Sequence, residues 1–85
     1  MAEQDKNNLE LEVKQLISAV TGRAPEEMTL ETDLARDVGI DSIKAIEIAV
    51  NIERKYKVRV RDEEVAKITT VGQTVDIVRD ALNRK

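Results

Sequence analysis

The chain has 85 residues, of which 41% are apolar and 36% charged, and its net charge is −3. This length supports one domain with one core over residues 1–85, and the composition excludes collagen-like and Pro/Gly-rich disordered chains. Because the sequence contains neither Cys nor His, disulfides, thiolate or imidazole metal sites and the usual general base at neutral pH are excluded. We therefore expect a protein that is not an enzyme.

Several partner classes are disfavoured on the same grounds. A single aromatic residue, Tyr56, provides no platform for stacking nucleic-acid bases, and a mildly acidic chain has little attraction for DNA or anionic lipid. No apolar run approaches the roughly 18 residues that a membrane span needs, and residues 1–8 contain no apolar signal segment. We expect a cytoplasmic protein that binds no nucleic acid and has no membrane span.

The first predicted helix covers residues 3–20. Its apolar stripe consists of Leu9, Val13, Leu16, Ile17 and Val20. Gly22 suits the left-handed cap that ends many helices. Residues 23–40 sustain no period, so we expect a long connection that packs back onto the core, with one helical turn at residues 33–37. Gly39 is expected to adopt a backbone conformation that other residues avoid.

A second long helix is predicted from Asp41-Ser42 to about residue 57. At about 100° per residue, one face carries Lys44, Glu47, Asn51, Arg54 and Lys55. The other face carries Ala45, Ile46, Ala49, Val50, Ile52 and Tyr56, with Ile43 and Ile48 at the two borders. This apolar arc is wider than a surface helix needs, so part of it is expected to remain exposed.

The remainder of the chain predicts two further helices. Residues 58–60 alternate like an extended segment, and residues 62–67 form a short helix with acids in its first turn. Residues 70–73 have the pattern of a capping box, which opens a last helix reaching about residue 83. The expected fold is an all-α four-helix bundle with three long helices, one short helix and a long loop between helices 1 and 2.

One candidate site stands at the start of the second long helix. Either Asp41 or Ser42 is the helix cap, or Ser42 is held outward where free N–H groups and the helix dipole suit a phosphate ester. No hydroxyl, lysine or carboxylate in the sequence has the partners that catalysis requires. The spacing of Asp33, Asp37 and Asp41 misses the calcium-loop pattern, so no metal site is expected.

Two motifs resemble the acyl carrier protein family. They are Asp-Val-Gly-Ile-Asp-Ser-Ile-Lys-Ala-Ile-Glu-Ile at residues 37–48 and Asp-Glu-Glu-Val-Ala-Lys-Ile-Thr-Thr-Val at residues 62–71. The resemblance implies that Ser42 carries a 4′-phosphopantetheine arm, transferred from coenzyme A by a phosphopantetheinyl transferase. Acyl groups would ride on the arm as thioesters and be presented to acyl-loading and acyl-processing enzymes. We expect the carrier to be a monomer.

The resemblance also implies roles for the residues around Ser42. Asp41 would help the transferase to recognise its substrate, and Ile43 and Ile48 would be apolar docking contacts. Partner choice would be set by Lys44, Glu47, Asn51, Arg54 and Lys55. The helix after the serine is usually acidic in fatty-acid carriers, whereas here five bases fall within residues 54–61. Such a stretch is either a solvated face or the mark of a specialised partner set.

Alternatives exist within and outside this family. The Gly-Ile-Asp-Ser-Ile-Lys segment is more similar to carriers of polyketide or polyunsaturated fatty-acid synthases than to fatty-acid carriers. A carrier of aminoacyl or D-alanyl groups would have the same arm with a different cargo. The alternative from a different class is an unmodified helical interaction domain, or a small binder of nucleic acid that uses the basic residues 54–61.

Overall fold

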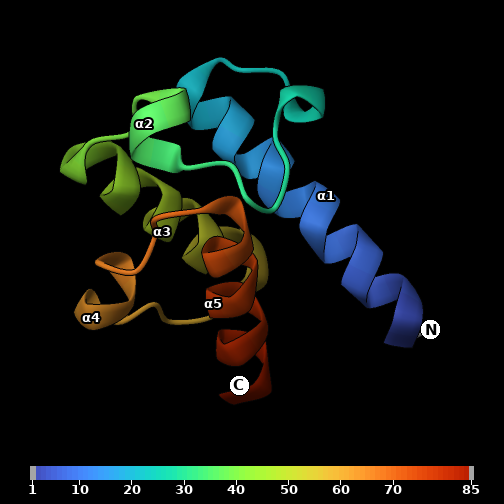
Figure 1. Ribbon diagram of the computed structural model, residues 1–85. Helices are drawn as coiled ribbons and strands as arrows, with labels where there is room; N and C mark the ends of the chain where they lie inside the picture. Colours follow the sequence, from blue (N-terminus) through green and yellow to red (C-terminus); the bar gives the residue numbers. More distant parts are fainter. Residues whose placement is uncertain (1, 85) are drawn as a thin grey trace.

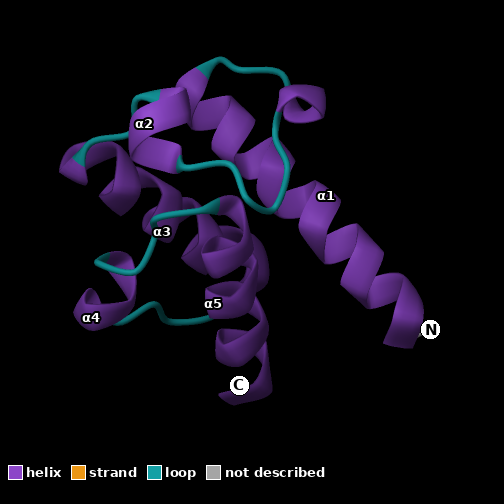
Figure 2. Cartoon of the chain, viewed as in Figure 1, coloured by secondary structure: helices purple, strands orange, loops and turns teal. Residues whose placement is uncertain are grey.

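Three long helices form the body of the computed structural model, which describes the backbone of residues 2–84 and the side chains of residues 8–84. They are α1 (Ala2–Thr21), α3 (Ser42–Tyr56) and α5 (Val71–Arg84) (Figure 1). The connections hold the short helices α2 (Leu34–Val38) and α4 (Asp62–Val65) and the 3-10 turn η1 (Pro25–Glu27). Residues 2–84 contain no strand (Figure 2). The predicted all-α bundle with a long loop after its first helix is confirmed.

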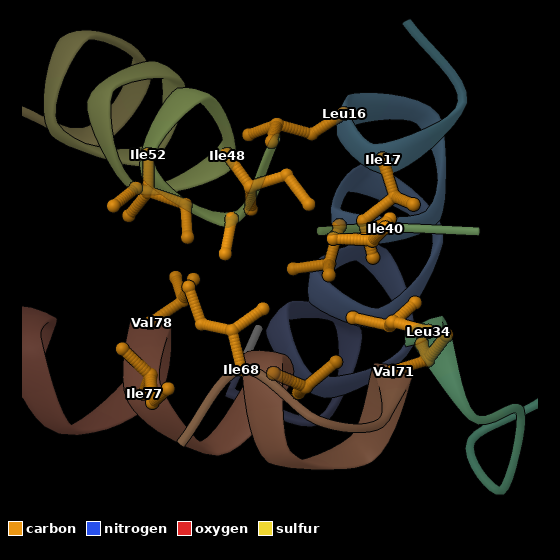
Figure 3. Close-up of a cluster of buried hydrophobic side chains, with 14 of the residues drawn as sticks. Leu16, Ile17, Leu34, Ile40, Ile48, Ile52, Ile68, Val71, Ile77 and Val78 are labelled. Carbon is orange, nitrogen blue, oxygen red and sulfur yellow. The ribbon is translucent and has the colours of Figure 1, made fainter. Parts of the chain in front are cut away.

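The core between α1, α3 and α5 is almost wholly aliphatic. Its fully buried apolar side chains include Val13, Ile17, Leu34, Ile48, Ile52, Val71 and Val78. Figure 3 shows Ile48 and Ile52 of α3 pointing toward side chains of α1 and α5. Burying each such side chain contributes roughly 1.5–3 kcal/mol, so this cluster is the main source of stability.

The rotation of α3 about its axis differs from the one predicted. Ile48, expected at the border of the polar face, is completely buried, whereas Ile46 and Val50, placed on the apolar face, are 53% and 40% exposed. The buried arc is centred on Ala45, Ile48 and Ile52, which follow the i, i+3, i+7 spacing of one helix face. The helices α1 and α4 contact α3, but they cover only part of its wide apolar arc. The prediction that Ile48 is an exposed docking contact is therefore wrong.

The connection between α1 and α3 is tied to the junction of α4 and α5. The backbone N–H of Leu34 donates to the Thr69 carbonyl at 2.8 Å, and that of Gly72 donates to the Leu30 carbonyl at 2.9 Å. A Cβ at position 72 would lie only 3.1 Å from the Leu30 oxygen, so glycine permits this close approach. The two bonds hold the connection in place just ahead of α3.

The short helix α2 confirms the turn predicted at residues 33–37. Asp33 caps its start by accepting a hydrogen bond from the Arg36 N–H at 2.8 Å. Gly39 ends it in the left-handed region, with φ of 74°, as the sequence predicts. The Ile40 N–H then donates to the Leu34 carbonyl at 2.9 Å, which directs the chain into α3.

Glu64 anchors the start of α4. Its buried carboxylate accepts hydrogen bonds from the Arg61 N–H at 3.0 Å and from the Arg84 guanidinium at 3.1 and 3.2 Å. Burial raises the pKa of Glu64, but the hydrogen bonds from Arg61 and Arg84 and the charges of both arginines outweigh it, so this pKa lies below its usual range. The last turn of α5 thereby holds α4 in position.

We predict that Glu64→Gln lowers the free energy of unfolding at pH 7. We also predict that this free energy changes less with pH in the variant than in wild type. A carboxylate whose pKa is lower in the folded state stabilises the fold above its unfolded pKa of roughly 4.3. That stability is lost as the pH falls through the folded pKa. Urea unfolding at pH 7 and at about pH 3 measures both effects. Glu63→Gln is the matched control, and an equal acid dependence in Glu64→Gln and wild type would contradict the prediction.

Candidate functional site

Asp41 and Ser42 occupy different positions at the start of α3. Asp41 is the cap, because its Oδ1 accepts a hydrogen bond from the Lys44 N–H at 3.0 Å. Ser42 is the first residue of the helix and is exposed. Within the part of the chain that the structure describes, its hydroxyl makes no hydrogen bond. The sequence left open whether Asp41 or Ser42 caps α3. The structure shows that Asp41 is the cap, so the Ser42 oxygen is not engaged in capping.

The position of Ser42 suits a phosphate ester. At the start of a 15-residue helix, the first backbone N–H groups have no partner inside the helix, and the dipole is positive. Both features favour a negatively charged group on the first residue. An exposed hydroxyl at this place therefore fits a covalently attached phosphodiester without loss of the helix cap.

An apolar cleft of about 610 Å³ opens beside Ser42, between α3 and α4. Its apolar lining consists of Ile40, Ala45, Ile46, Val65 and Ile68, among other residues. A second hollow of about 420 Å³ lies further along α3 and shares Ile46 and Val65 with the first. The short helix α4 thus borders two adjoining apolar hollows, the first of which has Ser42 at its rim.

An exposed apolar stripe runs along α3 from the residue after Ser42. Ile43, Ile46 and Val50 are 67%, 53% and 40% exposed, and their spacing of three and four residues places them on one side of the helix. Of these, only Ile43 was predicted as a surface contact. The excess width of the apolar arc was the signal in the sequence that could have identified Ile46 and Val50.

The polar residues predicted to set partner choice fall into two groups around the axis of α3. At about 100° per residue around the helix axis, Glu47 and Arg54 fall within about 70° of the centre of the apolar stripe. Lys44, Asn51 and Lys55 fall more than about 100° from it. Lys44 and Asn51 are also only half exposed. The structure therefore joins Ile43, Glu47 and Arg54 into one surface with Ile46 and Val50, and separates it from Lys44, Asn51 and Lys55.

The three aspartates before and at the start of α3 have structural roles. Asp33 caps α2, Asp41 caps α3, and Asp37 accepts a hydrogen bond from the Asp33 N–H at 2.9 Å. Among residues 8–84, no three acidic side chains gather closely enough to hold a metal ion. No described helix has the length and apolar content needed to cross a bilayer.

Comparison with known proteins places this site in a family. The family model for the phosphopantetheine attachment site matches residues 12–78, a segment that contains Ser42 and all of α3. The acyl carrier protein of Rhodococcus erythropolis is 41% identical over 68 residues, covering 80% of this chain and 75% of that protein. The meromycolate extension acyl carrier protein of Mycobacterium leprae is 40% identical over 67 residues, covering 79% and 58%.

Solved structures agree with this assignment. The crystal structure of an acyl carrier protein from Thermotoga maritima superimposes with a TM-score of 0.79 at 28% identity, covering 94% of this chain and 93% of that one. Hexanoyl acyl carrier protein from the actinorhodin polyketide synthase of Streptomyces coelicolor shares the fold, with a TM-score of 0.71 at 21% identity. The chain therefore belongs to the acyl carrier proteins, a family of carriers rather than catalysts whose prosthetic group is a covalently attached 4′-phosphopantetheine.

Proposed function

We propose that Ser42 carries the 4′-phosphopantetheine arm and that the protein presents acyl groups on it to enzymes of fatty-acid or polyketide synthesis. The observation that carries this proposal is the free, exposed Ser42 hydroxyl beside a cap supplied by Asp41. When bound, the arm supplies a terminal thiol, which the chain lacks because it contains no Cys. The chain itself catalyses nothing in this role and holds the arm at the start of α3.

The cleft beside Ser42 supports an aliphatic cargo. Seven of its lining residues are Ile, Val or Ala, and the lining also includes Asp33, Asp41 and Asp62. Away from these carboxylates, burying a charged amine against the apolar residues is costly, whereas burying methylene groups there is favourable at about 0.8 kcal/mol each. We propose that the acyl chain lies between α3 and α4, and this lining favours an acyl cargo over an aminoacyl or D-alanyl one.

We propose that partner enzymes dock on the α3 surface formed by Ile43, Ile46, Glu47, Val50 and Arg54. It begins next to the attachment residue, and it combines an apolar centre with charges at its edge, as protein interfaces do. Lys44, Asn51 and Lys55, predicted as docking residues, lie outside this surface and would contact only a partner that reaches around the helix. That the carrier is a cytoplasmic monomer stays a prediction.

Ser42→Ala should abolish attachment of the arm. Incubation of the apo protein with coenzyme A and a phosphopantetheinyl transferase of broad specificity should raise its intact mass by one phosphopantetheine group, and the variant should show no gain. Ser18→Ala is the matched control, because Ser18 is the only other serine in the chain, and it should be modified like wild type. An arm that is still attached in Ser42→Ala would overturn the proposed function.

Asp41→Asn separates transferase recognition from helix capping. Asparagine caps helices about as well as aspartate, so the free energy of unfolding should change by less than about 0.5 kcal/mol. If the negative charge beside Ser42 is recognised, the transferase kcat/KM should fall by about tenfold, which corresponds to 1.4 kcal/mol. An unchanged kcat/KM would show that Asp41 acts only as a cap.

Ile46→Ala should weaken docking without weakening the fold. Its side chain is 53% exposed, and alanine favours helix, so the thermal midpoint should stay close to that of wild type. We expect the transferase KM to rise about three- to tenfold, because roughly 1 kcal/mol of apolar contact is removed. Leu11→Ala, at an exposed apolar residue of α1, should leave KM unchanged. Equal KM effects in both variants would contradict a specific docking surface.

A further inference from the structure

Four basic residues gather at the end of α3 that is remote from Ser42. They are Lys57, Arg59, Arg61 and Arg84, and they line a surface hollow of about 530 Å³ together with Val58 and Ala81. We call this surface the basic end. Since α3 has 15 residues and rises about 1.5 Å per residue, the basic end begins about 22 Å along the helix from Ser42. It is thus separate from the attachment site.

The backbone after α3 creates the basic end. Lys57 takes a left-handed conformation, with φ of 58°, and ends the helix. In the extended segment that follows, Val58 and Val60 turn toward the protein and are half-buried and buried, so the alternate residues Lys57, Arg59 and Arg61 face outward. In Figure 1 this segment connects α3 to α4. It also reaches α5, because the Arg84 guanidinium donates to the Arg59 carbonyl at 3.2 Å.

The charges of the basic end are only partly neutralised. Three bases elsewhere in the described chain pair with acids within one helical turn, namely Lys14 with Glu10, Arg36 with Asp33 and Arg79 with Asp76. Neither Lys57 nor Arg59 forms an ion pair with any described residue. The same holds for Arg23, Lys44, Arg54, Lys55 and Lys67, so the basic end is distinguished by bases that line one hollow and not by the lack of pairs alone. Arg61 approaches Glu63 only at 4.0 Å, while Arg84 is paired with Glu64. The surface therefore keeps an excess of positive charge.

Local helix electrostatics account for only part of this excess, because Lys57 caps the end of α3 and Arg84 lies in the last turn of α5, where the dipole favours a base. Bases in the last turn of α3, Arg54 and Lys55, are stabilised by the negative end of the helix dipole. Arg59 lies beyond that turn, and Arg61 is the residue that precedes α4, where the positive dipole end favours acids instead. Within the described chain, the mutual repulsion of these bases is offset only in part, by the pair of Arg84 with Glu64 and by the acids that lie near Arg59 and Arg61. An anionic group from outside the chain would offset it.

We propose that the basic end docks a carboxylate-rich surface of a partner protein. This inference deepens the proposed function, on which it rests, by naming the chemistry of a second partner contact remote from the arm. Arginine pairs with carboxylates through two parallel hydrogen bonds, and it is enriched at protein interfaces. Acidic Glu53 and Asp62 line the adjoining hollow beside Arg59 and Arg61, so the surface presents both signs of charge.

The same features disfavour the other anionic partners. A nucleic acid or an anionic membrane attracts proteins through a broad positive field. This chain has a net charge of −3 and a single aromatic residue, so it is repelled at long range and has no base-stacking platform. A protein surface whose acids match a few arginines needs only short-range complementarity.

The test uses the full apo chain, labelled with ¹⁵N, and a polyglutamate peptide as the probe. Amide shift changes should centre on residues 57–61 and on Arg84 and should weaken as salt is added. The double variant Arg59→Glu/Arg61→Glu should reduce peptide affinity by about tenfold or more. The variant should retain the fold, because Arg61 donates to Glu64 through its backbone N–H and not through its side chain. An amide spectrum that is unchanged outside residues 57–61 and their neighbours verifies this.

Arg23→Glu/Lys67→Glu is the matched control. It makes the same change of net charge at two exposed bases outside the basic end, and it should retain peptide binding. An equal loss of affinity in both double variants, or an absence of binding by wild type, would overturn the proposal. So would tighter binding of a DNA duplex or of phosphatidylglycerol vesicles at residues 57–61. Because the probe needs no arm, failure of Ser42 modification in the mass assay would overturn the proposed function separately.

Discussion

Burial of Ile48 and Ile52 sets the rotation of α3 about its own axis, and the surfaces that this helix presents all follow from that rotation. With these two side chains in the core, Ile43, Ile46 and Val50 are left outside, next to the start of the helix. Rotating the helix to cover them would expose two fully buried isoleucines, each worth roughly 1.5–3 kcal/mol. A single packing arrangement therefore places both the core and the exposed apolar stripe.

The two neighbouring polar residues at the start of α3, Asp41 and Ser42, allow one residue to cap the helix while the hydroxyl of the other stays free. A helix cap contributes typically about 1 kcal/mol, and a residue that caps has its side-chain oxygen engaged with the backbone. Asp41 fills that position, so a bulky charged group on Ser42 leaves the cap intact. The positive end of the helix dipole then acts on the first residue of the helix, where a phosphodiester would sit.

The short helix α4 links the two functional surfaces. Its first turn is held by Glu64 and Arg84 next to the basic end, and Val65 and the residues after it line the cleft that has Ser42 at its rim. The net charge of −3 hides this arrangement, because acids and bases are unevenly placed over the surface. The protein thus combines an apolar stripe that begins beside Ser42 with a basic surface at the far end of the same helix.

Sequence by itself determined the features that depend on neighbours along the chain. The apolar stripe of α1, the turn at residues 33–37 and the left-handed Gly39 were predicted, because caps, turns and periodicity are local, and residues 37–48 carried the resemblance to the family. Thr70 likewise caps α5 as predicted, accepting from the Gln73 N–H at 3.1 Å. Only the tertiary structure decided the rest. Ile48 was assigned to the surface because periodicity gives the width of an apolar arc and not which helices cover it, and the contact of Glu64 with Arg84 joins residues 20 positions apart, beyond the reach of any local pattern.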